Sequence, residues 1–435
     1  MKKKQKVGVI TLGCSKNIVD SERLMNQLII NNCELTDDPN NAEVVIINTC
    51  GFIEAAKEES INTILNAVEL KKNGSLKKVI VSGCLSERYK SDLEKEIPEV
   101  DVYFGTEDYG GILKELGGEL KYELLGERVV TTPKHLAYLK ISEGCNNPCS
   151  FCAIPLIRGK HVSRPMEELL HEAELLAAKG TKELVIIGQD TTDYGIDIYG
   201  KRNLSELLSN LSGIQGLEWI RLLYAYPSHF PQEVLDVLKN NPKVCKYLDM
   251  PLQHISDNVL KSMRRGITSR RTRETIDRIK QAIPDIALRT TFIVGYPAES
   301  ESDFNELCEF VKEYQFDKVG VFTYSVEENT SGFILGDPVP EEVKEERKAI
   351  LMELQKDISF AKNRELVGKQ LRVIVDGFEG SRKEGYYIAR SMKDAPEVDG
   401  EILIPAKEKL ITGNFYDVKV YDCNDYDLYG EVLRI

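Results

Sequence analysis

The stretch Tyr138-Leu-Lys-Ile-Ser-Glu-Gly-Cys-Asn-Asn-Pro-Cys-Ser-Phe-Cys-Ala-Ile-Pro155 contains three cysteines, Cys145, Cys149 and Cys152, in the spacing Cys-x3-Cys-x2-Cys. No fourth cysteine follows until Cys245, so the local set holds three thiols. A [4Fe–4S] cluster normally takes four thiolates, and three would leave one iron open to a ligand that is not protein. A structural zinc takes four protein ligands, and only His161 could supply the fourth. The spacing favours an iron–sulfur cluster over zinc or inert thiols.

The chain before this stretch alternates between short apolar runs and helical segments. Its strand candidates are Lys6–Leu12, Val44–Asn48, Val79–Ser82 and Val100–Phe104, and its clearest helix candidates are Val19–Asn31 and Glu54–Lys72. Continuous Val and Ile runs separated by helices are typical of a parallel sheet covered on both faces. We therefore predict an α/β domain with a doubly wound parallel sheet over residues 1–120.

Three more cysteines each follow one of these strands: Cys14, Cys50 and Cys84. Ligand sites of open α/β sheets lie beyond the carboxyl ends of the strands. Each cysteine also has Gly or Thr before it, which lets the backbone approach a ligand closely. Free cysteines are commonly buried as small hydrophobes, but three at one sheet edge favour a second cluster. The remaining four, Cys33, Cys245, Cys308 and Cys423, are interpreted as structural.

The rest of the chain divides into a linker at 121–134, a second α/β domain at 135–362 and a small β domain at 363–435. The second domain has six strand candidates: Ala137–Ile141, Glu183–Gly188, Trp219–Tyr224, Tyr247–Met250, Ala287–Val294 and Val319–Tyr324. With helices between them they predict a partial (βα)6 barrel of the TIM-like type. After a charged helix at about Glu341–Glu365, short alternating strands at Leu371–Asp376, Gly385–Ala389, Glu401–Ile404 and Tyr416–Tyr421 are typical of a small, OB-like β-barrel.

Barrel chemistry occurs at the carboxyl ends of strands, where the cysteine triplet lies. Gln189, Gln253 and Arg289 are our candidates for cofactor contacts, against the alternative that they are ordinary polar strand ends or an interior structural arginine. The most basic stretch contains Arg264, Arg265, Arg270, Arg271 and Arg273. We interpret it as a solvated helix face, with contact to substrate or ribosome as the alternative.

The triplet, read as Cys145-x3-Cys149-x-Phe151-Cys152, resembles the signature of radical S-adenosylmethionine (SAM) enzymes, in which the open iron chelates the amino and carboxylate groups of that cofactor. The whole chain resembles the methylthiotransferase branch of these enzymes, and most closely the RimO type. That type modifies an aspartate of small-ribosomal-subunit protein twelve. Gly13-Cys-Ser-Lys-Asn17 matches its amino-terminal motif, and Asp394-Ala-Pro-Glu-Val-Asp-Gly400 resembles its form of the TRAM domain, otherwise a common RNA-binding module. One departure is Ala298, where the family usually has glycine.

The resemblance implies two [4Fe–4S] clusters, one on Cys145, Cys149 and Cys152 and one on Cys14, Cys50 and Cys84. The barrel cluster would deliver an electron to SAM, and the resulting 5′-deoxyadenosyl radical would take hydrogen from the β-carbon of the target aspartate. The amino-terminal cluster would hold the sulfur, and a second SAM would supply the methyl group. Such chemistry belongs to cofactors, because no side-chain base breaks an unactivated C–H bond. It needs an electron donor such as flavodoxin or ferredoxin.

The composition is that of a soluble protein: 435 residues, 42% hydrophobic and 29% charged. No stretch approaches the ~18 apolar residues of a membrane span, and no signal-peptide core follows the first residues. Ten cysteines without small-domain spacing fit a reduced, cytoplasmic protein that uses thiols as ligands. A formal net charge of −13 argues against wholesale binding to nucleic acid, which needs basic surface.

Charge also bears on the substrate. From Glu365 to Ile435 there are ten Lys and Arg and fourteen Asp and Glu, a formal charge of −4. Such a barrel would repel transfer RNA unless Arg382, Lys383, Arg390 and Lys393 were gathered on one side. Ribosomal proteins are basic and would be attracted. We expect protein twelve as the substrate, free or on the ribosome, and not transfer RNA.

Two alternatives come from other classes of function. One is methylthiolation of adenosine in transfer RNA, the MiaB type. The other is a non-catalytic iron–sulfur electron carrier, which would have no use for two open coordination positions. For the methylthiotransferase, the final β-barrel is expected to dock the macromolecular substrate and to be dispensable for both clusters and for SAM cleavage.

Overall fold

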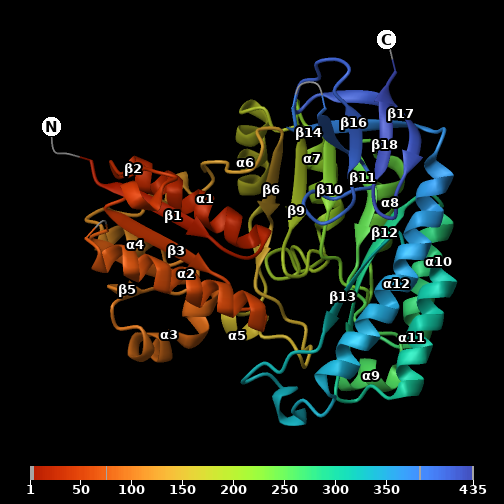
Figure 1. The fold of residues 1–435 in the computed structure, drawn as a ribbon, viewed down its shortest axis with the longest axis horizontal. Helices are drawn as coiled ribbons and strands as arrows, with labels where there is room; N and C mark the ends of the chain where they lie inside the picture. The colour runs from red at the N-terminus through yellow and green to blue at the C-terminus, as the bar shows by residue number, and fades with distance from the viewer. Residues whose placement is uncertain (1–3, 75, 382–383, 434–435) are drawn as a thin grey trace.

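The structure is a computed structural model that describes residues 4–74, 76–381 and 384–433. It has three parts in chain order: a parallel sheet, a curved six-stranded parallel sheet, and a closed β-barrel. Figure 1 shows the first part beside the second, with the closed barrel over one end of the middle sheet. The fold class predicted from the sequence is confirmed.

The amino-terminal sheet is doubly wound, with strand order β2-β1-β3-β4-β5 and parallel pairing throughout. Helices α1 and α4 pack on one face, and α2 and α3 on the other. The bounds are β1 Lys6–Thr11, α1 Ser15–Ile30, β2 Glu34–Leu35, η1 Pro39–Asn41, β3 Val44–Thr49, α2 Glu54–Lys72, β4 Lys78–Gly83, α3 Cys84–Glu96, β5 Val102–Tyr103, α4 Tyr109–Glu115 and η2 Tyr122–Leu124.

The middle sheet has the order β6-β9-β10-β11-β12-β13, all parallel, so the six predicted strands exist and are neighbours in chain order. An open barrel of this kind keeps a helix-covered outer face and a concave inner face. Its strands are β6 Leu136–Lys140, β9 Glu183–Ile187, β10 Trp219–Leu222, β11 Val244–Asp249, β12 Ala287–Val294 and β13 Lys318–Thr323. A short pair, β7 Ser142–Glu143 and β8 Val162–Ser163, closes the base of the cysteine loop.

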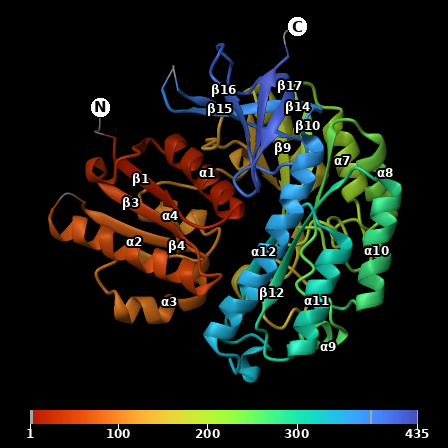
Figure 2. The same cartoon turned by 45° about the vertical axis from the view of Figure 1, so that its right-hand side comes forward.

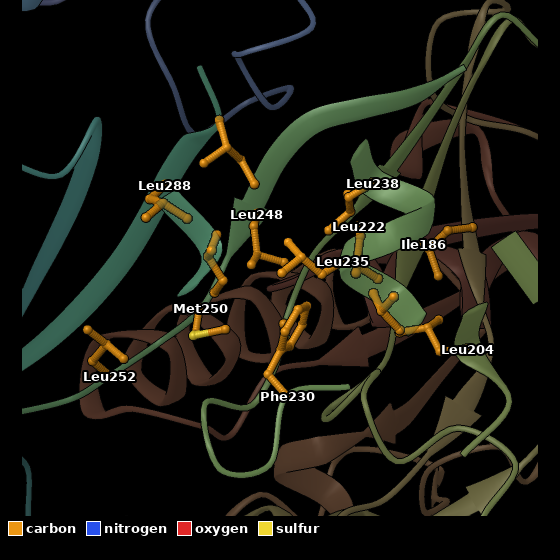
Figure 3. Packing of buried hydrophobic residues seen from close by; sticks show 14 of the residues in the cluster. Ile186, Leu204, Leu222, Phe230, Leu235, Leu238, Leu248, Met250, Leu252 and Leu288 are labelled. Atoms are coloured by element: carbon orange, nitrogen blue, oxygen red, sulfur yellow. The ribbon is translucent and has the colours of Figure 1, made fainter. Parts of the chain in front are cut away.

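The outer face of this sheet carries the largest apolar core of the described chain. Figure 3 shows Ile186, Leu222 and Leu248 of the strands packed against Leu204, Leu235 and Leu238 of the helices α7 and α8. Burying each such side chain contributes about 1.5–3 kcal/mol. The covering helices are α6 Met166–Ala178, α7 Leu204–Ser212, α8 Gln232–Asn240, α10 Ser269–Ala282, α11 Glu301–Tyr314 and α12 Glu341–Leu366. Figure 2 shows α7, α8, α10, α11 and α12 along the outside of the sheet. Shorter helices are α5 Ile154–Arg158, α9 Asp257–Ser262 and η3 Phe333–Leu335.

The carboxyl-terminal barrel closes in the order β14-β15-β16-β18-β17. Its strands are β14 Gln370–Glu379, β15 Tyr386–Ser391, β16 Ile402–Pro405, β17 Phe415–Cys423 and β18 Leu428–Val432. The barrel does not stand apart from the enzyme core. Ile374, Ala395 and Phe415 pack on the inner face of the middle sheet, which they share with Val19 of α1.

The segment predicted as a linker, 121–134, is firmly held. Arg128 is 2% exposed, and its guanidinium contacts Glu22 of α1 and Glu172 of α6. Glu22 also accepts hydrogen bonds from the backbone and hydroxyl of Thr131. The two α/β parts are thus joined by buried charge as well as by the chain. Within the described residues, no helix is long and apolar enough to cross a membrane.

Candidate iron–sulfur sites

The first cysteine set lies at the carboxyl edge of the amino-terminal sheet, as predicted. Cys14 follows β1, Cys50 follows β3 and Cys84 opens α3 directly after β4. Cys50 and Cys84 are buried, whereas Cys14 is exposed. Burial, with a smaller contribution from negative charge on Cys14 and Cys50, raises the pKa of the Cys84 thiol to about 12, although Arg158 acts to lower it.

Two glycines allow these strand ends to converge. Gly13 has φ +88°, and a Cβ there would lie 2.6 Å from the Cβ of Cys50. Gly83 has φ +96°, and a Cβ would lie 2.6 Å from the carbonyl oxygen of Thr49. Only glycine takes such conformations without strain and leaves that space. The Gly-Cys pairs of the sequence are thus a geometric requirement of the site.

Asn17 ties this edge together. Its Nδ2 donates to the carbonyl oxygens of Leu12, at 2.8 Å, and Thr49, at 3.1 Å, so it joins the ends of β1 and β3. Its Oδ1 lies 3.6 Å from the Sγ of Cys84. The last residue of the Gly13–Asn17 motif therefore holds the loops that present the cysteines.

The second cysteine set lies on the loop between β7 and β8, beyond the carboxyl end of β6. The backbone N–H and Nδ2 of Asn147 approach the Sγ of Cys145 at 3.5 and 3.4 Å. The Nη1 of Arg265 donates to the Sγ of Cys149 at 3.2 Å. Burial raises the pKa of Cys145 to about 11 and of Cys152 to about 12, so metal binding here must displace protons.

Neither cysteine set is arranged as a preformed zinc site. Tetrahedral zinc at Zn–S ≈ 2.3 Å would hold its thiolates about 3.8 Å apart. In the part of the chain that the structure describes, no three candidate ligand atoms that include a cysteine sulfur lie within 4.8 Å of one another. His161, the fourth zinc ligand that the sequence offered, bonds Ser163 at 3.0 Å. A polynuclear centre, whose thiolates bind different irons, stays the prediction for both sets.

The two cysteine sets are neighbours across the boundary between the α/β parts. Helix α5 starts two residues after Cys152, and Ala153 and Ile157 pack on Cys84. At the end of this helix Arg158 donates to Cys84 Sγ at 3.3 Å and to Asp20 at 2.8 Å. One short helix therefore spans from one set to the other.

A buried charge cluster surrounds this junction. Lys140 bonds the carboxylates of Asp20, Glu107 and Glu143. These three carboxylates are the one group of three or more metal-ligand side chains among the described residues that lies within 4.8 Å, and the ammonium of Lys140 bonds all three. Burial would raise the pKa of Asp20, but Lys140 and Arg158 lower it to about 2. The cluster joins the two α/β parts through buried ion pairs.

The three predicted cofactor contacts occupy different places. Gln189 follows β9 and donates to Glu143 at 2.6 Å, while its buried Oε1 has no partner among the described residues. Gln253 has the uncommon φ of +75° and is bridged to Phe292 of β12. Arg289 lies in the first half of β12, where it faces Asp249 at 3.8 Å and Asp399 of the carboxyl-terminal barrel at 3.5 Å. The roles of all three remain predictions.

Two arginines of these sites were missed. Arg265 was assigned to a solvated face with its neighbours, and this is wrong: it is 4% exposed, against Cys149 and the ring of Tyr226. Arg158 was not considered. Within the run of arginines at 264–273, no local sequence feature distinguishes the buried Arg265 from its neighbours. Arg158, by contrast, is a single arginine on a short helix directly after the cysteine loop, and that pattern could be searched for in a sequence.

Three carboxylates of the TRAM-like motif at 394–400 contact the middle sheet. Asp394 pairs with Lys318 of β13 at 3.0 Å, Glu397 accepts from the Tyr138 hydroxyl at 3.1 Å, and Asp399 accepts from Tyr247 at 2.7 Å. Arg390 is 3% exposed and paired with Glu183 and Asp376, so it offers nothing to a nucleic acid. Arg382 and Lys383 lie outside the described residues.

Family models match all three parts: "Uncharacterized protein family UPF0004" at residues 6–105, "Radical SAM superfamily" at 139–311 and "TRAM domain" at 367–433. The protein named ribosomal protein uS12 methylthiotransferase RimO of Christiangramia forsetii is 54% identical over the whole chain and 95% of that relative. The RimO protein of Cytophaga hutchinsonii is 52% identical over 99% of the chain and 98% of that relative. The chain belongs to the RimO family.

Solved structures support the fold of this RimO-family chain. A radical SAM methyltransferase, TsrM of Kitasatospora setae, aligns with TM-score 0.55 at 14% identity, covering 76% of this chain and 77% of its own. The cobalamin-dependent radical enzyme OxsB aligns with TM-score 0.53 at 13% identity, over 81% of this chain and 56% of its own. At such identities the likeness concerns the fold alone. It places the RimO-family chain among radical SAM architectures, in agreement with the family model.

Proposed function

We propose that this protein is a radical SAM methylthiotransferase that adds a methylthio group to the β-carbon of an aspartate in ribosomal protein uS12. The observation that carries the proposal is sequence identity of 52–54%, over 99–100% of the chain, to proteins named ribosomal protein uS12 methylthiotransferase RimO. Two three-cysteine sets, adjacent through α5, supply the sites that such a reaction needs. The substrate implies a cytoplasmic location.

The proposed cofactors are two [4Fe–4S] clusters, one held by Cys145, Cys149 and Cys152 and one by Cys14, Cys50 and Cys84, together with SAM. When bound, the barrel cluster and SAM would supply hydrogen abstraction from carbon, and the second cluster would supply the sulfur. An electron donor such as flavodoxin or ferredoxin completes the requirement. N–H donors already point at cysteine sulfurs in both sets, as suits anionic thiolates.

The chain's own part is to bind, orient and exclude water. Gln189 is fixed by Glu143 through its amide nitrogen, which leaves its Oε1 to accept from a cofactor amine. Gln253 has a left-handed backbone conformation, and such strained residues cluster at active sites and ligand-binding sites. Arg289 is proposed as the floor of the cofactor site, held there by Asp249 and Asp399.

The carboxyl-terminal barrel covers part of the inner face of the middle sheet. Residues near 394–399 cover the inner face of the middle sheet at the amino-terminal half of its strands, through contacts to Tyr138, Tyr247 and Arg289. Radical intermediates require such protection. The substrate then approaches from the carboxyl-end side, where both cysteine sets lie.

The acidic character of the chain favours a basic protein over transfer RNA as substrate. The net charge is −13, and Arg390 of the final barrel is buried in ion pairs with Glu183 and Asp376. Phosphate backbones need accessible cations. Association with uS12 should therefore weaken as salt rises, because salt screens attraction between opposite surface charges.

The deciding experiment supplies anaerobically reconstituted enzyme with SAM, sulfide and reduced flavodoxin, and offers uS12 and unmodified transfer RNA in parallel. We expect a methylthio group on one aspartate of uS12 and none on adenosine, read by mass spectrometry. The opposite result would assign the MiaB-type reaction. If the enzyme cleaves SAM but modifies neither uS12 nor transfer RNA, the substrate assignment is wrong while the assignment of radical chemistry still holds.

A further inference from the structure

Each cysteine set has one buried arginine that donates a hydrogen bond to one of its sulfurs. Arg265 Nη1 lies 3.2 Å from Cys149 Sγ, and Arg158 Nη2 lies 3.3 Å from Cys84 Sγ. The two arginines are 4% and 8% exposed. Neither belongs to the cysteine motifs, and they come from different elements: the loop after α9 and the end of α5.

Arg265 is locked in place by its surroundings. Its Nη2 donates to the carbonyl oxygen of Pro251 at 2.6 Å, and the guanidinium stacks on the Tyr226 ring at 4.3 Å. The Tyr226 hydroxyl in turn donates to the backbone oxygen of Arg265 at 2.6 Å. The donor aimed at Cys149 therefore cannot swing to solvent.

Arg158 is held from both α/β parts. Its Nη1 donates to Asp20 at 2.8 Å and to Glu143 at 3.0 Å, and its Nη2 donates to Asn17 at 2.5 Å. Asp20 and Asn17 belong to α1, while Glu143 belongs to β7 beside the second cysteine set. The guanidinium thus keeps its hydrogen bond to Cys84 only when the two parts are docked.

Hydrogen bonds to cluster sulfurs are one of the main factors that set the reduction potential of an iron–sulfur centre. A cationic donor favours the reduced state, which carries one more negative charge, and so raises the potential. A guanidinium does this with a fixed, planar donor set that a lysine cannot reproduce. Two such donors, one to each site, would act on the two centres separately.

We propose that Arg265 and Arg158 are positioning residues, each of which sets the reduction potential of one of the two clusters: Arg265 that on Cys145, Cys149 and Cys152, and Arg158 that on Cys14, Cys50 and Cys84. The inference rests on the proposed function, because it assumes that both sets bind clusters. Both arginines act through a cysteine ligand and not on substrate.

The test uses full-length protein in two backgrounds, each of which retains one cluster. Cys14, Cys50 and Cys84 are replaced by Ala in the first, and Cys145, Cys149 and Cys152 in the second. Arg265→Met and Arg158→Met are introduced into both, and the potential of the remaining cluster is measured by titration followed by electron paramagnetic resonance. Should the Met variants fail to fold, Arg158→Lys keeps the charge that Asp20 and Glu143 need, and Arg265→Lys keeps a cation beside Cys149.

We expect Arg265→Met to lower the potential in the first background only, and Arg158→Met to lower it in the second only. The Lys variants should restore part of each shift. Full iron content with unchanged potentials would overturn the inference, as would equal shifts in both backgrounds, which would indicate general loosening. Absence of iron from both parent backgrounds would instead overturn the cluster assignment in the proposed function.

Discussion

Glu172 is a fully buried carboxylate that three arginines surround. It lies on α6 and contacts Arg23 of α1, Arg128 of the connecting segment and Arg164 beside its own helix. Burial alone would raise the pKa of Glu172, but Arg128, Arg164 and Arg23 lower it to about 2. This one side chain therefore joins the two α/β parts and compensates cations that would otherwise be stranded in the interior.

Replacing Glu172 by Gln should destabilise the protein by about 3–5 kcal/mol, the usual cost of breaking a buried ion pair from one side. Urea unfolding at neutral pH measures it. The matched control is Glu168→Gln on the same helix, because Glu168 is 62% exposed and lies 3.9 Å from Arg164. That control should change the free energy of unfolding by less than about 1 kcal/mol. Equal effects would contradict the role of Glu172.

The same group predicts how stability depends on pH. Its pKa is lower in the folded state, about 2, than its ordinary value of 4.5, so its contribution is complete above pH 4.5 and is lost as pH falls toward 2. The pKa of Asp20 is also lowered to about 2. The free energy of unfolding should thus decline between about pH 5 and pH 2, by on the order of 3 kcal/mol for Glu172. Glu172→Gln should show a flatter profile in that range.

At the scale of elements, the turns after β1 and β4 decide the amino-terminal site. The strand β4 passes into α3 through Gly83, and Cys84 is the first residue of the helix. This arrangement leaves no room for a loop, so the cysteine is fixed by strand and helix together. It also depends on a left-handed glycine that sits against Thr49.

Gly83→Ala should therefore remove the amino-terminal cluster and spare the other, so that iron per chain falls by about half in the reconstituted protein. Gly74→Ala is the control, because Gly74 also has a positive φ, +81°, but nothing lies within 4 Å of a Cβ there. Gly74→Ala should cost about 1 kcal/mol of stability and no iron. A Gly83→Ala protein with full iron would show that the turn tolerates a side chain.

Most elements could be predicted from the sequence because their signal is local. Buried strands such as β3 and β9 are continuous apolar runs, and the predicted β12 has the observed bounds. The missed elements lack that signal: β2 has two residues, and α3 starts at a cysteine already assigned to a strand end. The predicted start of α1 at Val19 was late, because the helix begins at Ser15, directly after Cys14.

The candidate site was predictable in its cysteines and not in its arginines. The cysteines could be predicted because each lies within a few residues of a predicted strand end, next to Gly or Thr, and strand ends are where ligands bind in such sheets. The burial of Arg265, Arg158 and Arg390 instead depends on partners more than 70 residues away: Cys149, Cys84 and Glu183. From local sequence alone a charged side chain is predicted to be exposed, because the distant segment that buries it cannot be identified.

For the whole molecule, the carboxyl-terminal barrel is packed firmly on the middle sheet. That it docks the substrate and is dispensable for the clusters stays a prediction, but its contacts indicate a role in stability: Glu183 at the start of β9 pairs with both Arg221 and Arg390 in the interior. Arg221 further donates to the backbone oxygens of Met392 and Ser391. These charged side chains are shielded from solvent, and they join the barrel to the first residues of β9 and β10.

Deleting the residues after Leu366 should consequently lower the melting temperature or leave the protein aggregated, since it exposes Tyr138 and Tyr247 and leaves Glu183 with Arg221 as its one partner. Circular dichroism on heating and light scattering provide the measurement. A milder change, Arg390→Met, should destabilise without deletion by leaving Glu183 with one partner. A truncated protein that melts like the full chain would show that the barrel only rests on the core.

Trp219 is the single tryptophan of the chain, and its place has an optical consequence. Its indole is 1% exposed, edge-on to Phe415 of the final barrel with ring centres 4.8 Å apart. Its fluorescence thus reports on the packing of the final barrel against the middle sheet. A red shift in emission would time the separation of the barrel from the sheet during unfolding, and iron–sulfur absorption would quench that light when the centres are loaded.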